Sequence, residues 1–363
     1  MEKINKKNLF KFFLKKKILV TGATGFKGAW LCLWLSLLGA KVTACGMKKN
    51  SQKLFFNFKL ENKIKTYFFD INNYPDFEKV IKKSKPEIIF HLAAQPLVIN
   101  SYLDPLNTFK TNILGSLNLL EIVRRNKFVK SLIIITTDKV YKNNDKIKLF
   151  KETDEIGGND PYSASKASVE LILKSYKKSF YLNNYIGVAS CRAGNVIGGG
   201  DFSKNRLIPD IINSLLKNKK IILRNPNFIR PWQHVLEPII GYMMLAKLTY
   251  KYPKLYSGEY NFGPNISSCK KVRELVQKSI EIWGNGEFIN NNSNNKKFIE
   301  HKNLFLSILK ARKILKWKPI LSFNESIKIT IEWYKEVHLN NASPYKISKK
   351  QIKFFQNKYL KSI

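Results

Sequence analysis

The sequence predicts an α/β protein built on a doubly wound parallel sheet, with a smaller C-terminal lobe interleaved with that sheet. Three observations predict this fold. Short apolar runs of strand length alternate with longer helical patterns through residues 17–197. A glycine-rich turn separates the first apolar run from the first helical pattern. From Gly198 onward the alternation loosens, which indicates a second and smaller lobe.

The glycine-rich turn is the feature around which the chain is organised. Ile18–Val20 is an apolar run typical of a buried parallel strand, and Gly22, Gly25 and Gly28 follow it. Apolar residues then recur at helical spacing over residues 30–38. Glycines permit the tight turn, the close approach of a pyrophosphate to the main chain, and close packing of helix on strand. The helix N-terminus favours the phosphates, so this stretch predicts a dinucleotide site.

The other elements follow in chain order. Strands are expected at residues 41–45, 67–69, 87–91, 132–135 and 187–190, and helices at 75–84, 108–125 and 162–180. The smaller lobe is expected to hold a flexible turn at 198–200, a helix at 209–216, a strand at 221–223 and a surface loop at 284–297. The expected domains are a basic lead-in (1–16), an NAD-binding Rossmann domain (17–197) with a returning segment near 230–250, a mainly substrate-binding lobe (198–340), and a basic tail (341–363) with a loose terminal helix.

The residues after the second strand bear on the choice of cofactor. Dinucleotide folds often place an acid there, on the ribose hydroxyls. Residues 45–49 are Cys, Gly, Met, Lys and Lys, so this acid is missing and NADP is not excluded beside NAD. Asp70, at the end of the third strand, is the candidate partner for the adenine end.

The net charge of +38 has two interpretations. A basic surface can bind nucleic acid or another anionic surface. A composition rich in lysine, asparagine and isoleucine gives the same total, and we favour it because the basic residues are spread in twos and threes along the chain. We therefore expect no nucleic-acid partner. No apolar run reaches the ~18–20 residues of a membrane span, so no membrane association is expected either.

The four cysteines, Cys32, Cys45, Cys191 and Cys269, are widely scattered. No pair has the spacing of metal ligands, and no disulfide framework is indicated. We therefore expect no metal site and a cytoplasmic location.

Tyr162 and Lys166 form the second informative motif. Residues four apart share one face of a helix, so both side chains can point the same way. A nearby ammonium can lower the pKa of a phenol. We therefore expect Tyr162 to serve as a base that removes a hydroxyl proton during hydride transfer.

These motifs resemble the extended short-chain dehydrogenase/reductase family, whose members act on nucleotide-activated sugars. The resemblance covers about residues 17–333 and rests on the phrases TGATGFKGAWLCLWL, HLAAQPLV, TTDKVY, DPYSASK, RAGNVIGGGD, IRPWQHVLEP and NFGP. Within the family the phrases look most like the branch of 4,6-dehydratases that act on CDP-glucose. The resemblance implies NAD as cofactor, a homodimer with a tetramer possible, and a place in deoxysugar and surface-polysaccharide biosynthesis.

The triplet Thr137-Asp138-Lys139 distinguishes the reactions of the family. The CDP-glucose enzymes carry Asp-Lys at this position, the dTDP-glucose enzymes carry Asp-Glu, and epimerases and simple reductases lack the pair. Oxidation of C4 to a ketone acidifies the C5 proton, so elimination of water needs a base at C5 and an acid at the C6 hydroxyl. The resemblance implies Lys139 as the base and Asp138 as the acid, with Thr137 on the C4 oxygen.

Three alternatives stay open. Another nucleotide-sugar 4,6-dehydratase would use the same residues, whereas a 4-epimerase would need Tyr162 but not Lys139. A non-catalytic dinucleotide-binding or nucleic-acid-associated protein is the distant alternative, suggested only by the charge.

The candidate site residues fall into three groups. The expected catalytic residues are Thr137, Asp138, Lys139, Tyr162 and Lys166. Cofactor binding is expected at Gly22, Thr24, Gly25, Phe26, Lys27, Gly28, Asp70, Ile71, Leu92, Ala93, Ala94, Tyr162 and Lys166. Substrate binding is expected at Gln95, Asn195, Arg206, Arg230 and Gln233, with Arg230 suited to a bidentate phosphate contact. His234 is given no catalytic role, and Glu237 is expected to satisfy local polar groups. Helices near 109–123 and 162–180 are expected to pair with their symmetry mates in the dimer.

Overall fold

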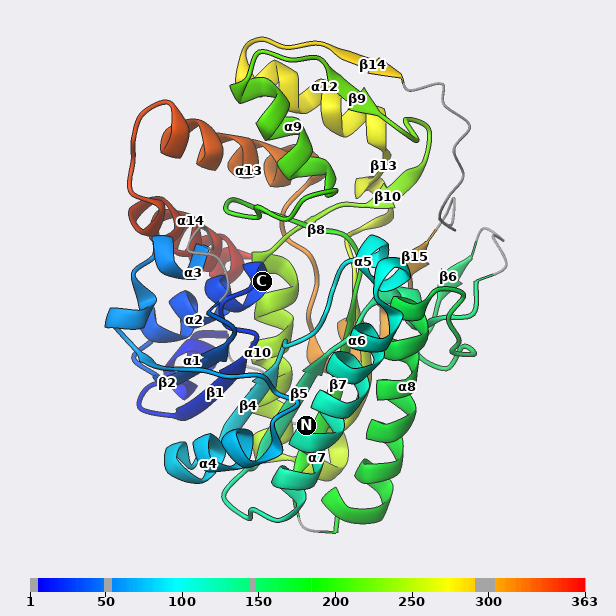
Figure 1. The fold of residues 1–363 in the computed structure, drawn as a ribbon. Helices are drawn as coiled ribbons and strands as arrows, with labels where there is room; N and C mark the ends of the chain where they lie inside the picture. Colours follow the sequence, from blue (N-terminus) through cyan, green and yellow to red (C-terminus); the bar gives the residue numbers. More distant parts are fainter. Residues whose placement is uncertain (1–5, 49–53, 144–147, 184, 291–303, 363) are drawn as a thin grey trace.

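A computed structural model describes residues 6–48, 54–143, 148–183, 185–290 and 304–362. In Figure 1 a parallel sheet flanked by helices occupies the lower part of the molecule, and a smaller lobe lies above it. The strands are β1 Lys17–Thr21, β2 Lys41–Gly46, β3 Lys65–Phe68, β4 Ile88–His91, β5 Ser131–Ile135, β6 Leu149–Phe150, β7 Gly187–Ala193, β8 Val196–Ile197, β9 Ile221–Leu223, β10 Ile229–Pro231, β11 Gln233–His234, β12 Gly258–Phe262, β13 Cys269–Lys271, β14 Phe288–Asn290 and β15 Phe305–Leu306.

The helices connect and cover these strands. They are α1 Lys6–Phe12, α2 Phe26–Leu37, α3 Leu54–Asn57, α4 Tyr74–Ser84, α5 Val98–Leu103, α6 Pro105–Phe109, α7 Gly115–Arg124, α8 Pro161–Tyr176, α9 Leu207–Leu216, α10 Leu236–Lys251, α11 Pro253–Tyr256, α12 Val272–Trp283, α13 Phe323–His338 and α14 Pro344–Lys361. Short 3₁₀ turns lie at η1 Leu60–Asn62, η3 Asp138–Val140 and η5 Ile266–Ser268, and π-helical turns at η2 Lys110–Leu114, η4 Lys177–Tyr181 and η6 Ala311–Leu315.

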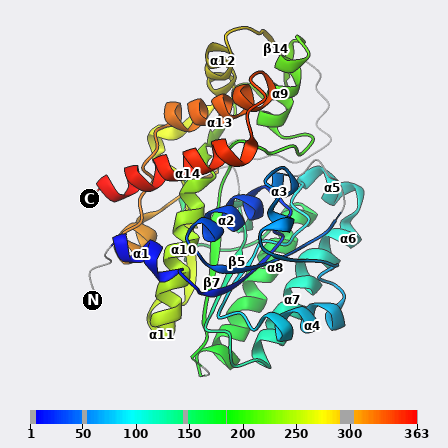
Figure 2. The same cartoon turned by 90° about the vertical axis from the view of Figure 1, so that its left-hand side faces the viewer.

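The central sheet has seven parallel strands in the order β3-β2-β1-β4-β5-β7-β12. The strand order reverses between β1 and β4, and ligands of such sheets bind at this point, beyond the carboxyl ends of the strands. Helices α4, α7 and α8 cover one face, while α2 and α10 cover the other (Figure 2). Because both faces are buried, the strands are continuous apolar runs rather than alternating ones. The doubly wound parallel sheet expected from the sequence is confirmed.

The smaller lobe is assembled from α9, α12, α13 and short two-stranded pairs. Strand β10 pairs with β13 in antiparallel fashion, and β9 pairs with β14 in parallel. The expected surface loop is therefore wrong over Phe288–Asn290, which form β14; residues 291–297 lie outside the described part of the chain. The chain returns to the sheet through α10, which lies in the segment expected to return near 230–250. It then adds the strand β12, which pairs with β7 and lies beyond that expected segment.

The turn at Gly198–Gly200 is buried, so the expectation of a flexible turn is wrong. A Cβ on Gly199 would lie 2.1 Å from the ring of Trp333 in α13. The Trp30 indole donates a hydrogen bond to the Gly199 carbonyl at 3.0 Å. This turn therefore packs against both the first helix of the sheet domain and the last helix of the lobe.

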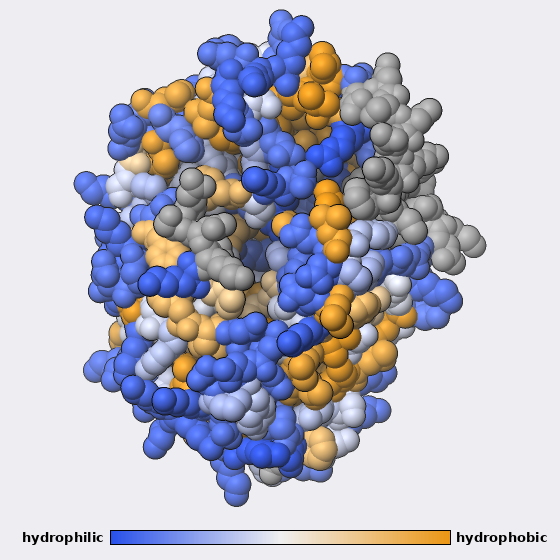
Figure 3. All heavy atoms as spheres, in the orientation of Figure 1, coloured by the Kyte–Doolittle hydropathy of each residue, from blue (hydrophilic) through white to orange (hydrophobic). Residues whose placement is uncertain are grey.

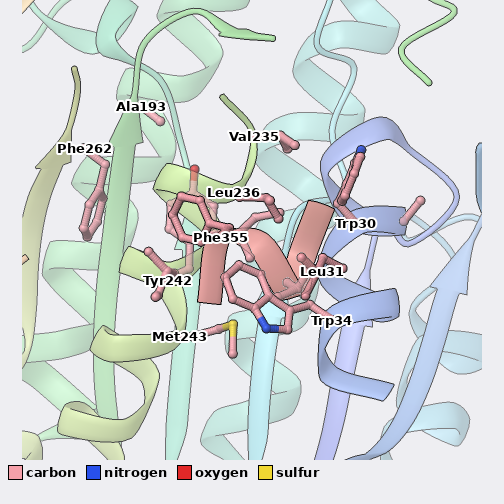
Figure 4. Packing of buried hydrophobic residues seen from close by; sticks show 14 of the residues in the cluster. Trp30, Leu31, Trp34, Ala193, Val235, Leu236, Tyr242, Met243, Phe262 and Phe355 are labelled. Atoms are coloured by element: carbon pink, nitrogen blue, oxygen red, sulfur yellow. The ribbon is translucent and has the colours of Figure 1, made fainter. Parts of the chain in front are cut away.

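The C-terminal segment forms a helix, but the helix is not loose. Phe355 and Tyr359 of α14 are buried, and the Phe355 ring lies 5.7 Å from the ring of Trp34 in α2 in an edge-on arrangement. Figure 4 shows Phe355 between α2 and the residues of α10. The N-terminal lead-in is ordered as well: its residues 6–12 form α1, and Leu9 of this helix is buried in the same core. Both ends of the described chain therefore stabilise the face of the sheet covered by α2.

Glu237 lies buried in the first turn of α10, with 1% of its surface exposed. Its Oε1 atom accepts hydrogen bonds from the backbone N–H groups of Ile320 and Leu321 at 2.8 and 2.7 Å, as expected for a residue that satisfies local polar groups. No described residue pairs with Oε2. Burial raises the pKa of Glu237 to about 8, because the charged form loses its hydration.

This burial gives a pH-dependent contribution to stability. Between the ordinary pKa of 4.5 and the folded value of about 8, the native state holds a proton that the unfolded chain has released. The free energy of unfolding should therefore fall as pH rises through this window, by up to a few kcal/mol for this one group. Urea unfolding over this pH range should show a steeper fall for the unmodified protein than for Glu237→Gln. Glu281→Gln, on an exposed face of α12, should keep the original slope; equal slopes for Glu237→Gln and the unmodified protein would contradict the assignment.

Candidate active site

A large cleft opens beyond the carboxyl ends of the central strands, between the sheet and the smaller lobe. Its volume is about 2390 Å³, whereas a site for one drug-sized ligand occupies roughly 300–1,000 Å³. The cleft therefore has room for a dinucleotide and a second ligand together. Of the expected site residues, Gln233 does not line it; all the others do.

The glycine turn forms one wall of the cleft and fits a dinucleotide. Gly22 has φ +67°, and a Cβ on it would lie 2.6 Å from the backbone nitrogen of Ala93. A Cβ on Gly28 would lie 2.2 Å from the Gly22 carbonyl oxygen. Gly25 is the N-cap of α2, so the free N–H groups of a twelve-residue helix begin at this turn. Close backbone packing with a helix N-terminus facing the cleft is the arrangement that binds a pyrophosphate.

The far end of this wall lacks the acid that often follows the second strand. Gly46 and Met47 line the cleft there, and a Cβ on Gly46 would lie 2.6 Å from the Thr24 hydroxyl. Asp70 also lines the cleft; its Oδ1 atom accepts hydrogen bonds from the backbone and side chain of Asn72 at 2.9 and 3.0 Å. Asp70 is therefore the carboxylate available to the adenine end of a dinucleotide.

The triplet Thr137-Asp138-Lys139 begins two residues after the end of β5. The Thr137 hydroxyl donates to Asp138 Oδ1 at 3.0 Å and accepts from the backbone N–H of Lys139 at 3.3 Å. Asp138 is 3% exposed, and no described residue pairs with its Oδ2 atom. Burial raises the pKa of Asp138, although the neighbouring Lys139 opposes this shift. A carboxyl group with a raised pKa suits a proton donor.

Tyr162 and Lys166 lie in the first turns of α8, whose N-cap is Asp160. Both are buried and line the cleft. The expectation that Lys166 lowers the pKa of Tyr162 is wrong for this structure: burial raises that pKa to about 12. The Lys166 ammonium donates to the Ile135 carbonyl at 3.3 Å instead. Sequence spacing gave the shared helix face correctly, but burial outweighs the neighbouring charge.

Several cationic side chains line the cleft near Tyr162 and Lys166. Burial lowers the pKa of Lys27 to about 8, and the nearby Arg206 lowers it further, while Asp138 opposes the shift. Burial also lowers the pKa of Lys166 to about 8, with Lys27 as the next cause. Arg206 thus acts on Lys27, and Lys27 acts on Lys166, so these cations lie near one another and suit the binding of phosphate groups.

The residues expected to bind substrate differ in the partners that their polar groups already have within the chain. Arg206 pairs with Asp201 at 3.0 Å, and Arg230 donates to the Ile229 carbonyl while facing the cleft. The Gln95 side-chain amide is held by Leu97 and Thr108, so it shapes the turn after β4. Gln233 corrects the expectation: it is 1% exposed and its amide donates to the Phe262 carbonyl at 2.9 Å.

A buried row of hydrogen-bonded side chains, Thr21, His91 and Ser116, lies next to the glycine turn and was given no role from the sequence. Ser116 donates to the Asn112 carbonyl at 2.6 Å, so the Nε2–H of His91 donates to Ser116 at 3.1 Å. His91 Nδ1 is then the acceptor for the Thr21 hydroxyl at 2.7 Å, and that hydroxyl accepts from the Ala93 N–H. Burial lowers the pKa of His91 to about 3, consistent with this neutral tautomer. His91 is the last residue of β4 and the first of the phrase HLAAQPLV. This position was the one local feature of the sequence that pointed to a role for His91.

His234 is also buried and stays without a catalytic role. Its ring lies 6.0 Å from the Trp30 ring in an edge-on arrangement, and its Nδ1 atom accepts from the backbone N–H of Leu236. Burial lowers the pKa of His234 to about 3. The side chain does not line the cleft.

Comparison with known proteins identifies the family. The model of the GDP-mannose 4,6 dehydratase family matches residues 19–330. The chain is 40% identical over 330 residues to the CDP-glucose 4,6-dehydratase of Salmonella typhimurium, which covers 89% of this chain and 92% of that protein. The chain belongs to the GDP-mannose 4,6 dehydratase family. This confirms the resemblance to extended short-chain dehydrogenases/reductases.

Other members and neighbours of the GDP-mannose 4,6 dehydratase family are more distant. The dTDP-glucose 4,6-dehydratase 1 of Escherichia coli is 27% identical, over 88% of this chain and 92% of that protein. A dTDP-glucose 4,6-dehydratase structure from Bacillus anthracis in complex with NAD has TM-score 0.73 and 24% identity, over 89% of this chain and 97% of that chain. The UDP-glucose 4-epimerase structure from Thermotoga maritima has TM-score 0.75 and 24% identity, over 88% of this chain and 99% of that chain. The two structures support the fold.

Proposed function

We propose that this chain is an NAD-dependent CDP-glucose 4,6-dehydratase, a hydro-lyase that converts CDP-D-glucose to CDP-4-keto-6-deoxy-D-glucose and water. The observation that carries the proposal is the sharing of one cleft by two pairs of groups, Tyr162–Lys166 and Asp138–Lys139. An oxidation at C4 needs only the first pair, whereas a dehydration needs both. The 40% identity to a CDP-glucose 4,6-dehydratase supports the same assignment.

The cofactor proposed is NAD. The tight cradle of Gly22 and Gly28 and the helix N-terminus at Gly25 fit a dinucleotide, and structural neighbours were solved with NAD. NAD⁺ bound in this cradle would supply a hydride acceptor for C4 of the sugar and then a hydride donor for C6, so no net redox change would occur. The chain's own residues supply binding, orientation and proton transfer.

Proton transfer at C4 belongs to Tyr162 in this proposal. The phenolate form of Tyr162 removes the C4 hydroxyl proton, while the Thr137 hydroxyl, a hydrogen-bond partner of Tyr162, binds the same oxygen. Lys166 supports the phenol and the nicotinamide ribose. Burial raises the pKa of Tyr162 to about 12, so this role requires ligand binding to favour the phenolate.

Elimination belongs to Asp138 and Lys139. The new C4 ketone acidifies the C5 proton, which Lys139 removes as a neutral amine. Asp138 gives its proton to the departing C6 hydroxyl, which leaves as water. When C6 receives the hydride, C5 takes a proton back from Lys139, which returns to the neutral amine. The raised pKa of Asp138 favours its protonated form and supports this role.

The choice of nucleotide is tested by comparing kcat/KM for the glucose derivatives of CDP, dTDP, UDP and GDP, with NAD⁺ and NADP⁺ each supplied. A site that hydrogen-bonds a particular base rejects analogues by as much as about 10⁴–10⁵-fold, so we expect strong preference for CDP-glucose. The product should be a 4-keto sugar. Formation of CDP-galactose would identify an epimerase, and equal turnover of dTDP-glucose would contradict the CDP assignment alone.

We further propose a cytoplasmic homodimer formed through α5, α6 and α8. Helix α8 lies within one of the two helices expected to pair, 162–180, whereas α5 and α6 replace most of the other, 109–123, because the apolar side chains Leu119, Leu120, Ile122 and Val123 are buried within the chain. Figure 3 shows apolar side chains on the face where α6 and α8 lie. Leu103, Leu106 and Leu171 are 76%, 78% and 57% exposed there. Helices α6 and α8 pack together, so a second copy could cover these leucines at once.

The cysteines, all four of them unbridged, support the cytoplasmic location. Among the described residues, no helix is long and apolar enough to cross a membrane.

The dimer is tested by light scattering at micromolar concentration. The unmodified protein should have twice the 42.1 kDa mass of the chain, and the double variant Leu106→Glu, Leu171→Glu should have the mass of one chain. Leu255→Glu places the same charge on α11, at a leucine 64% exposed, and should leave the dimer intact. A monomeric unmodified protein would contradict the proposal.

A further inference from the structure

A buried ion pair lies behind the cleft and takes no part in the proposed chemistry. Glu170 of α8 and Arg192 of β7 have side chains that are 2% and 3% exposed. Arg192 Nε donates to Glu170 Oε1 at 3.0 Å, and Nη2 donates to Oε2 at 2.9 Å. Two parallel hydrogen bonds fix the orientation of both side chains as well as their separation.

The pair is joined to other groups on both sides. The Glu170 oxygens also accept from the hydroxyls of Thr136 at 2.6 Å and Ser190 at 2.7 Å. Arg192 Nη1 donates to the Tyr141 hydroxyl at 2.9 Å, and Tyr141 in turn donates to another buried side chain, Asn261, at 2.7 Å. Every oxygen of the buried carboxylate is therefore satisfied twice. Such a network is rigid, because any displacement leaves buried polar groups unpaired.

Thr136 and Tyr141 stand at the two ends of the segment that contains Asp138 and Lys139. Between them the backbone makes only the 3₁₀ turn η3, so no strand or long helix holds this segment. Glu170 binds one end and Arg192 binds the other. The pair therefore adds a side-chain anchor at each end of the segment, beside the backbone hydrogen bonds from the Thr136 N–H to the Cys191 carbonyl at 2.9 Å and from the Gly157 N–H to the Val140 carbonyl at 2.7 Å.

The same pair is connected to the other half of the site. Tyr162, Lys166 and Glu170 follow one another at intervals of four on α8, so they share one face of that helix. Glu170 thus connects the helix of Tyr162 to the segment of Lys139. Glu170 is therefore one of the links that fix the relative position of the two reacting pairs, beside the contact of Thr137 with Tyr162.

We propose that Glu170 and Arg192 are positioning residues that hold the elimination pair, Asp138–Lys139, at a fixed distance from Tyr162. The inference rests on the proposed dehydratase function. Proton transfer at C5 and C6 requires heavy atoms at about 2.6–3.2 Å, and a misplacement of about 1 Å can cost roughly 10²-fold in rate. Tyr162 is held by the hydrogen bonds of its own helix. Loosening the pair therefore slows elimination more than oxidation at C4.

The test uses Thr136→Val, which removes one hydroxyl donor to Glu170 and keeps both charges. Thr330→Val is the matched control, because Thr330 is a fully buried threonine on α13 whose hydroxyl donates to Ser326. With CDP-glucose, we expect Thr136→Val to lower kcat about tenfold or more with KM unchanged. Reduced nicotinamide should accumulate in a single turnover, since oxidation proceeds and elimination lags. The control should show neither effect.

Tyr141→Phe gives an independent second variant at the Arg192 end of the network and should show the same accumulation. If the unmodified protein forms the 4-keto product and both variants behave like Thr330→Val, the positioning role is wrong while the proposed function stands. If the unmodified protein forms no 4-keto product, the proposed function fails. Amide hydrogen exchange then decides the positioning role: faster exchange over residues 137–141 in both variants, but not in the control, supports it, and unchanged exchange contradicts it.

Discussion

Lys139→Met is expected to lower the rate of CDP-glucose dehydration by about 10²–10⁴-fold, the usual effect of removing one positioned acid or base. Methionine keeps the length of the side chain but has no basic nitrogen for the C5 proton. Lys139 lines the cleft, whereas the glycine turn that fits NAD lies on another wall. NAD binding should therefore be unchanged. In a single turnover the variant should oxidise C4 and then stop, so that reduced nicotinamide accumulates.

Lys142→Met is the matched control. Lys142 lies three residues further along, is exposed, and pairs with Glu155 at 3.0 Å outside the cleft. Exposed ion pairs contribute about 0–1 kcal/mol, so this variant should fold and dehydrate normally. Normal dehydration by Lys139→Met would show that Lys139 is not the base.

The sheet and the glycine turn could be predicted because their signals are local. An apolar run, a glycine spacing and a helical period all lie within one stretch of sequence, and parallel pairing of the strands follows from the helices between them. The strand Gly258–Phe262 was not assigned to the sheet because it follows the loosened rhythm of the lobe. Its pairing with β7 depends on residues far away in the chain.

The buried polar groups show the limit of sequence reasoning more sharply. Glu170 and Arg192 are 22 residues apart, and Thr21 and His91 are 70 apart, so no spacing rule joins them. Gln233, which stands in the phrase IRPWQHVLEP, was assigned to the substrate together with Arg230. Side chains alternate in direction along an extended segment, and Arg230 and Trp232 line the cleft while Gln233 points into the core.

Charge states were the least predictable feature. The spacing of Tyr162 and Lys166 suggested a lowered phenol pKa, but that inference assumes an exposed pair. Both residues are buried in the structure, and burial disfavours the charged form of each: the pKa of Tyr162 is raised and that of Lys166 is lowered. Burial depends on the whole fold, which spacing does not encode.

Tyr162→Phe is expected to lower the rate of the same reaction by about 10²–10⁴-fold, but by blocking an earlier step. Phenylalanine fills nearly the same volume on α8 and lacks the phenolate oxygen that accepts the C4 hydroxyl proton. Without that acceptor, oxidation of C4 does not proceed. In a single turnover neither reduced nicotinamide nor a 4-keto sugar should accumulate, the opposite of the result expected for Lys139→Met.

Tyr176→Phe is the control on the same helix. Its hydroxyl donates to Glu121 at 3.4 Å, near the end of α8 and outside the cleft, so this variant should react normally. The two variants of the reacting pairs then separate the steps. Accumulation of reduced nicotinamide in Tyr162→Phe would mean that another group accepts the C4 proton. Its absence, together with accumulation in Lys139→Met, would assign oxidation to the residue on α8 and elimination to the segment after β5, because each loss would stop the sequence at a different intermediate.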